Sequence, residues 1–180
     1  MTRVTEDILD EFLVLAAQSG KEAAFEQLAR RWHARLFGFA RGILRSAEDA
    51  EDVMQESWLA IAQGLRRLQD PAKFRSWAHG IVSRKCVDLI RKRSSVPRTR
   101  SADAGDATAE LNTESRPVAD LRDALSRLRP QERAILSLFY LERTPVSQIA
   151  VTLGLKAGTV KSRLFEARQS LKRAMERMNS

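Results

Sequence analysis

The fold of this chain is decided by residues 47–68, which read AEDAEDVMQESWLAIAQGLRRL. Apolar residues recur here at the i, i+3, i+4 spacing of a helix with one buried face, and the preceding Ser46 is a residue type that caps helix N-termini. Asp70 and Pro71 end the pattern. The expected buried face consists of Val53, Met54, Ser57, Ile61, Ala62, Leu65 and Leu68.

A second face of this predicted helix is polar. It carries Asp49, Asp52, Gln55 and Glu56. Acids in the first turn of a helix favour its dipole, so a solvated face is the simplest interpretation of these residues taken alone.

The next segment, residues 74–93, combines a helical pattern with rings and positive charge. Phe74 and Trp77 stand near its start, and rings beside cations suit single-stranded or melted DNA, whose bases stack and whose phosphates are negative. The alternative, that the two rings belong to the core, stays open. The expected buried stripe is Ala78, Ile81, Val82, Cys86, Leu89 and Ile90, and the basic residues are Arg75, Arg84, Lys85, Arg91, Lys92 and Arg93.

Composition divides the chain into two helical parts. Residues 71–100 carry 9 basic and 1 acidic side chains and residues 121–180 carry 12 and 5, whereas residues 101–120 between them carry 1 and 5. Small polar residues with proline and glycine dominate residues 94–117, which predicts a flexible linker. No stretch alternates in the manner of a strand. We therefore expect an all-α fold with domains over residues 1–93 and 118–180.

The second part contains a helix-turn-helix pattern. Val146, Ile149, Ala150 and Leu153 mark the inner face of one helix, Gly154 supplies the turn, and Val160 and Leu164 anchor a second helix against the first. Outward positions of the second helix can address base edges and phosphates in a major groove. The alternative is a basic helical hairpin that does not bind DNA. The position of Gly154 at the turn favours DNA binding. The outward positions are Thr159, Lys161, Ser162, Phe165, Glu166 and Arg168.

Composition also limits the function classes. The chain has 180 residues, of which 43% are hydrophobic and 30% charged, and its net charge of +8 favours an anionic partner. The apolar stretch at residues 12–17 is too short to span a bilayer, so we expect no signal peptide and no membrane insertion. Cys86 is the only cysteine. With no metal-ligand spacing, phosphate loop or nucleophile motif, we expect a cytoplasmic protein without metal, cofactor or enzymatic activity.

Two motifs carry a resemblance to a known family. DAEDVMQES (residues 49–57), followed by the segment at 74–93, resembles the second conserved region of extracytoplasmic-function sigma factors of the sigma-70 superfamily. The helix-turn-helix with GTVKSRL (158–164) resembles both sigma factors and the output domains of response regulators, so the first domain decides between them. The resemblance covers residues 20–93 and 118–178. It implies a factor that binds core RNA polymerase and directs it to promoters.

The resemblance also implies partners and roles for the residues above. The polar face of Asp49, Asp52, Gln55 and Glu56 would dock on the clamp helices of the largest polymerase subunit, and the second domain would meet the flap of the second-largest subunit and read the −35 element. The loop at residues 68–73 would capture a flipped base of the −10 element, and the helix from Phe74 would hold the duplex open. An anti-sigma protein is a further expected partner. The expected −10 residues are Gln69, Asp70, Lys73, Phe74, Trp77, Arg84, Lys85, Arg91 and Lys92.

Some positions depart from the family pattern, and other functions compete. Arg84 stands where many relatives carry Asn, Lys156 replaces a small capping residue, and Glu166 stands where a basic residue is frequent, so the family's base preferences are not carried over. Pro71 stiffens the capture loop. The competing functions are a regulator that binds duplex promoters without polymerase and a small nuclease or other DNA-modifying enzyme.

Overall fold

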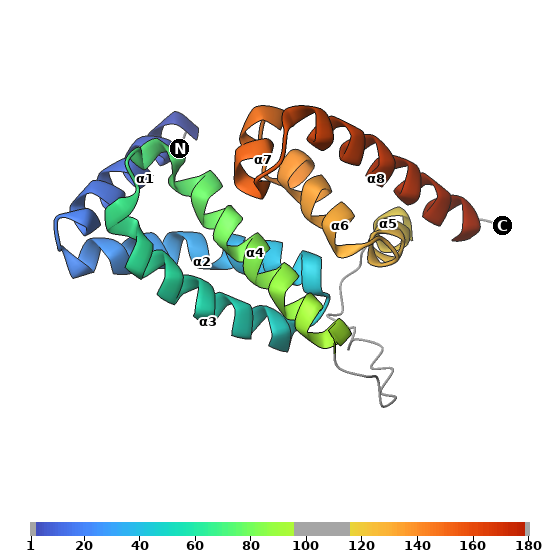
Figure 1. Ribbon diagram of the computed structural model, residues 1–180, viewed down its shortest axis with the longest axis horizontal. Helices are drawn as coiled ribbons and strands as arrows, with labels where there is room; N and C mark the ends of the chain where they lie inside the picture. Colours follow the sequence, from blue (N-terminus) through green and yellow to red (C-terminus); the bar gives the residue numbers. More distant parts are fainter. Residues whose placement is uncertain (1–2, 96–115, 179–180) are drawn as a thin grey trace.

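The computed structural model describes residues 3–95 and 116–178, and all regular structure in these ranges is helical (Figure 1). The prediction of an all-α fold is confirmed. The first unit comprises α1 (Arg3–Gln18), α2 (Glu22–Leu44), α3 (Ala47–Gly64), the 3-10 turns η1 (Leu65–Arg67) and η2 (Pro71–Lys73), and α4 (Phe74–Ser95). The second unit comprises α5 (Arg116–Ser126), α6 (Pro130–Leu136), the π-helical turn η3 (Ser137–Leu141), α7 (Val146–Leu153) and α8 (Ala157–Met178).

Most of the predicted linker, residues 96–115, lies outside the described residues. Its two ends do not fit the prediction, because residues 94 and 95 continue α4 and residues 116 and 117 begin α5.

The core of the first unit is built on α2. Leu28, Trp32, Leu36, Phe39 and Ile43 recur every three or four residues and are all at least 96% buried, so one face of α2 lies against α1, α3 and α4. Such burial of large side chains contributes roughly 1.5–3 kcal/mol for each residue.

α3 begins where the sequence predicts, but the α-helix ends at Gly64 and residues 65–67 continue as the 3-10 turn η1. The Ser46 hydroxyl accepts a hydrogen bond from the Asp49 backbone N–H at 3.1 Å, which caps the first turn. At the other end the Asp70 side chain accepts from the Ala72 N–H at 3.1 Å and Pro71 opens η2, so the chain turns between α3 and α4. The predicted buried face is largely confirmed: Ala62 is exposed instead, and Leu68 is half-buried.

The second unit is a helix-turn-helix. α7 ends at Gly154, whose φ of 64° lies in the left-handed region that glycine adopts without steric cost, and the Leu155 N–H bonds back to the Ala150 carbonyl at 2.8 Å. Ile149, Val160 and Leu164 are buried where α7 and α8 pack together. The predicted motif is confirmed.

The two units lie against each other. In Figure 1 the second unit, coloured yellow to red, stands beside α4 and the C-terminal end of α2. α7 packs on α4 and α6 packs on α2. The sequence predicted two domains joined by a tether and gave no indication of this contact.

Candidate functional site

The exposed face of α3 combines acids with a large apolar side chain. Asp52, Gln55 and Glu56 are exposed, and Leu59, one turn further on, is 62% exposed. The spacing i, i+3, i+4, i+7 places the four residues on one stripe. Sequence reasoning missed Leu59, although its position in this series is the signal that could have found it.

Glu56 is the paired member of this stripe. Its carboxylate lies 2.8 Å from the Lys85 ammonium of α4, and this hydrogen bond and charge lower the pKa of Glu56 below its usual value. Glu56 is exposed and Lys85 is partly exposed, so the ion pair adds little to stability and can exchange for a partner's charges.

Asp49 does not belong to the exposed stripe, which corrects the expectation for this residue. Its side chain is 7% exposed, and both carboxylate oxygens accept hydrogen bonds from the Arg93 guanidinium at the end of α4. A bidentate pair of this kind fixes geometry. Asp49 therefore ties the start of α3 to the end of α4.

An open cleft of about 440 Å³ lies between the end of α3 and the start of α4. It brings together most of the loop residues that the sequence singled out. The half-buried Trp77 ring covers Gly64 so closely that a Cβ at residue 64 would stand 2.8 Å from the ring. The cleft is lined by Gly64, Arg67, Leu68, Gln69, Asp70, Lys73 and Trp77.

Two internal contacts shape this loop. Lys73 lies 3.1 Å from the Asp70 carboxylate, and the Gln18 side chain of α1 donates hydrogen bonds to the Leu65 and Leu68 carbonyls at 2.9 and 2.7 Å. Gln18 satisfies two loop carbonyls at once and was not predicted, because nothing in the local sequence links α1 to a loop about 50 residues away.

Phe74 is a core residue, which corrects its assignment to DNA. Its side chain is 1% exposed and meets the Trp32 ring edge to face at 5.7 Å. Of the two rings at the start of α4, Trp77 is the accessible one.

The basic residues of α4 point to two sides. Lys85 and Lys92 line a cleft with the α3 stripe, whereas Arg84 lines a different cleft whose other wall is the second unit, with Thr152 and Arg163. Arg91 borders both. The structure therefore does not gather the predicted −10 residues into one strip.

The predicted reader positions of α8 share an exposed side of the helix. Thr159 is half-buried, and the other five positions are exposed. Among the described residues Glu166 has no ion-pair or hydrogen-bond partner. The other exposed positions are Lys161, Ser162, Phe165 and Arg168.

Arg168 is held by a neighbouring aromatic pair. Its Nε donates to the Tyr140 hydroxyl at 2.9 Å, and its guanidinium lies 5.2 Å from the Phe139 ring centre and 5.6 Å from that of Tyr140. The π-helical turn η3 presents the two rings edge to face, with their centres 5.0 Å apart. Sequence reasoning missed Tyr140, because a π-helical turn holds one residue more than an α-helical turn and the 3.6-residue pattern of apolar positions does not reveal it.

The described residues were also compared with two kinds of reactive site, a metal cluster and a reactive thiol. They contain no group of three or more His, Cys, Asp or Glu side chains arranged to hold a metal ion. Burial raises the pKa of the Cys86 thiol to about 12, so it is no nucleophile at neutral pH. None of the described helices combines the length and apolar character needed to cross a membrane.

Comparisons with known proteins agree with this architecture. The chain matches the family descriptions Sigma-70 region 2 over residues 28–96 and Sigma-70, region 4 over residues 119–171. It is 33% identical to the ECF RNA polymerase sigma factor SigM of Mycobacterium tuberculosis over 95% of this chain and 87% of that protein. It is 26% identical to the RNA polymerase sigma-H factor of Pseudomonas aeruginosa over 93% of this chain and 94% of the relative.

Solved structures show the same fold. The structure of CnrH in complex with the cytosolic domain of CnrY aligns with a TM-score of 0.70 and 28% identity over 93% of this chain and 97% of that one. The Bartonella quintana sigma factor RpoE, crystallised with the anti-sigma factor NepR, aligns with a TM-score of 0.68 and 22% identity over 84% and 96%. The matched regions contain the α3 stripe, the cleft at Trp77 and the helix-turn-helix. The chain belongs to the extracytoplasmic-function group of RNA polymerase sigma factors, and its function lies in transcription initiation.

Proposed function

We propose that the chain binds core RNA polymerase through the α3 stripe and opens promoter DNA at a −10 element through the cleft at Trp77. The cleft is the observation that carries the proposal. It joins an aromatic face to the cations Arg67 and Lys73 at an open surface, which are the groups that hold an unstacked base and its phosphates.

On the polymerase side, the stripe would meet basic residues of the clamp helices of the largest subunit. Leu59 supplies the apolar contact at its end and Asp52 an exposed charge. Interfaces draw most of their affinity from a few desolvated side chains, and charges at the rim set the association rate. Asp49 has no part in this surface, because it is buried.

On the DNA side, capture of a flipped base would draw on binding energy alone, with no bond made or broken by this chain. Unstacking a base costs a few kcal/mol, and stacking it on an aromatic ring returns about 1–3 kcal/mol. Trp77 would take the base, and Arg67, Lys73 and the exposed cations of α4 would hold the backbone. Phe74 supports Trp77 from the core, since the two ring centres lie 6.2 Å apart.

The second unit would read the −35 element with α8 and contact the polymerase flap. Its exposed Lys161, Phe165 and Arg168 fall on one stripe, at i, i+4 and i+7. An anti-sigma protein is proposed as a further partner, because the two similar solved structures contain CnrH with CnrY and RpoE with NepR.

The test is a selection with purified components. Core RNA polymerase with and without the chain is mixed with a pool of duplexes randomised over about 40 base pairs, and the bound duplexes are sequenced. We expect enrichment of two separated motifs only when both proteins are present. Enrichment by the chain alone would favour the polymerase-independent regulator, and strand cleavage in the pool would favour the nuclease. Either result, or no enrichment, would contradict the proposal.

A further inference from the structure

One arginine of α8 is held in place by neutral groups. The Arg168 guanidinium lies over the Phe139 and Tyr140 rings, at 5.2 and 5.6 Å from their centres, and its Nε donates to the Tyr140 hydroxyl at 2.9 Å. Both rings come from the π-helical turn η3, and irregular turns of this kind occur often at functional sites. A guanidinium that is already fixed loses little conformational entropy when it binds a ligand.

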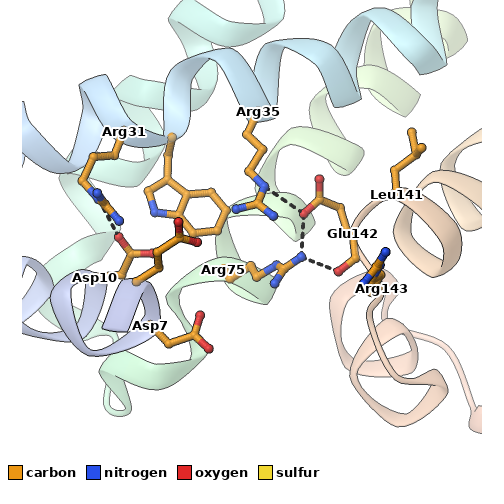
Figure 2. A pocket seen from close by; sticks show the side chains of 10 residues that line it. Asp7, Asp10, Arg31, Arg35, Arg75, Leu141, Glu142 and Arg143 are labelled. Atoms are coloured by element: carbon orange, nitrogen blue, oxygen red, sulfur yellow. Dashed lines mark hydrogen bonds and ion pairs between the residues drawn. The ribbon is translucent and has the colours of Figure 1, made fainter. Parts of the chain in front are cut away.

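Other arginines of the chain are neutralised by acids. The Glu142 carboxylate, which is only 9% exposed, lies 2.8 Å from the Arg75 guanidinium and 3.3 Å from that of Arg35 (Figure 2). Figure 2 shows Glu142 reaching from the second unit toward these two side chains of the first, and Arg31 beside Asp10 at 3.0 Å. An arginine paired in this way presents little net charge to a further anion.

Arg168 differs, because its charge is not neutralised. Among the residues that the structure describes, no carboxylate forms an ion pair with it, and its hydrogen bond runs from Nε to Tyr140. The terminal Nη groups therefore keep their N–H donors. The Tyr140 oxygen accepts from Arg168, so the Tyr140 O–H is free to donate as well, and this side chain is 55% exposed. Donors of both residues beside one positive charge fit an anion with several acceptor oxygens.

The position of Arg168 on α8 indicates which anion this is. Lys161, Phe165 and Arg168 follow each other along one exposed stripe, and Arg168 lies at its border, since it is four residues past the buried Leu164. When a helix enters a major groove, the middle of its exposed face meets base edges, and its borders meet the sugar–phosphate strands on either side. A border cation in line with a second cation therefore matches the phosphates of one DNA strand.

We propose that Tyr140 and Arg168 form a binding site for one backbone phosphate of the duplex that α8 enters. The guanidinium would donate through its Nη groups and the tyrosine through its hydroxyl, while the Phe139 ring keeps the guanidinium in place. Such a contact fixes how the helix lies in the groove and carries no sequence information itself. The site rests on the proposed function, because it takes −35 binding by α8 as given.

The pairing of the two residues is tested first, in the free chain. Tyr140 is the only tyrosine of the sequence, so carbon-13 labelling of tyrosine rings gives the signals of one residue in a nuclear magnetic resonance spectrum. Arg168→Ala should shift these signals, because it removes a hydrogen bond to the hydroxyl and a cation from the ring face. Arg30→Ala, which removes an exposed arginine of α2, is the matched control and should leave them unchanged. Unchanged signals in Arg168→Ala would overturn the site.

The phosphate is tested next, with core polymerase bound to the chain (holoenzyme) and a selected duplex. Each phosphate of the −35 region is replaced in turn by an uncharged methylphosphonate, and the affinity for every duplex is measured. With the parent, replacement of a contacted phosphate should weaken binding by about tenfold. Arg168→Ala should no longer respond to one of these replacements, and its slope of log affinity against log salt should be smaller than the parent's by about one.

Tyr140→Phe separates the hydroxyl from the ring. It keeps the aromatic face beside the guanidinium and removes the oxygen, so the response to the same replacement should become smaller. Helix content and melting temperature should stay unchanged, because the side chain is exposed. Arg30→Ala again serves as the control and should show the parent's response at every phosphate.

Three results of the duplex measurements would overturn the site. A parent-like response of Arg168→Ala at every phosphate would show that no phosphate is bound there. Loss of selectivity at one base pair would show that Arg168 reads a base, and weaker binding to core polymerase with an unchanged phosphate response would show that its partner is an acid of that protein. Failure of the proposed function would differ, because the parent itself would then select no duplex, and the site would fall with it.

Discussion

At the scale of single residues, burial decides which predicted side chains remain available to a partner. Asp49 and Phe74 match the sequence pattern as well as Asp52 and Trp77 do, yet the first two are buried and the last two are accessible. Sequence spacing assigns a residue to a face of its helix. It does not reveal that Arg93 reaches back over Asp49, because that contact joins residues 44 positions apart.

Glu166 gives a prediction at this scale. An acid beside phosphates is tolerable if it accepts a hydrogen bond from a cytosine amino group, pairs with a neighbouring Arg or points off the DNA. Among the described residues Glu166 forms no pair with a neighbouring Arg, so the first and third explanations remain. If Glu166 reads cytosine, Glu166→Ala should relax selectivity at one −35 position by about 1–3 kcal/mol. The change in selectivity is measured as holoenzyme affinity for all single-base variants of a selected −35 element. Lys161→Ala is the control, because loss of a cation that contacts phosphate should weaken binding equally at every position. A uniform gain at every position would show a merely repelled acid.

His79 gives a second prediction, in its response to pH. Its side chain is 1% exposed, and burial, opposed by its hydrogen bond to the Arg75 carbonyl and by Glu142, lowers its pKa below the ordinary 6.5. Arg75 and Arg35 act in the same direction as burial. The unfolded chain then binds more protons than the folded one as pH falls below 6.5, so stability is complete above that pH and is lost below it.

The measurement is the melting temperature between pH 7.5 and 5.5, above the range where most carboxylates titrate. The loss in the free energy of unfolding is limited to about 1.4 kcal/mol per pH unit. In a chain of this size, a loss of about 1 kcal/mol lowers the melting temperature by about 2–4 °C. His79→Leu should remove the decline, whereas His33→Gln, at the exposed second histidine, should keep it. A decline of equal size in His79→Leu would show that other groups cause it.

At the scale of elements, the number of packed sides decides how a helix presents its residues. α3 packs on α2 and α4 and keeps one long exposed stripe, whereas α4 contacts α1, α2, α3, α6 and α7 and is exposed mainly in its C-terminal half, at Arg84, Asp88 and residues 91–93. The basic residues of α4 are therefore divided between two clefts. A sequence pattern with cations on every turn predicts a basic helix, but it cannot say which cations share a surface.

The stripe on α3 gives the prediction that belongs to this scale. Asp52→Lys and Leu59→Ala should each weaken binding to core polymerase, the first by reversing a charge and the second by removing a large exposed apolar contact, with a loss of about 1–2 kcal/mol for Leu59→Ala. Helix content and melting temperature should stay unchanged, because both side chains are exposed. Leu121→Ala on α5, also an exposed leucine, is the matched control. Parent-like core binding by both variants would remove the stripe from the interface.

At the scale of the whole molecule, local and long-range features differ in what the sequence can predict. The helices around Ser46, Asp70, Pro71 and Gly154 were predictable, since caps and breakers act on their own neighbours. The contact between the units was not, because Glu142 lies 67 residues from Arg75 and no motif links the two. The α3 stripe and the Trp77 cleft were partly predictable from the family resemblance, and the helical spacing could have revealed Leu59, whereas Gln18 and Tyr140 emerged only from the fold.

The central claim is that binding of a flipped base at Trp77 opens the promoter, with no covalent bond made or broken. It is tested most directly by the fluorescence of 2-aminopurine placed at the −10 element of a selected duplex, recorded as holoenzyme is added. The parent should raise the fluorescence as the base leaves the stack. Trp77→Ala should lose most of this rise on the duplex and keep most of its binding to a template already mismatched across −10, since that template needs no opening. An undiminished rise with Trp77→Ala, or equal loss on both templates, would contradict the account.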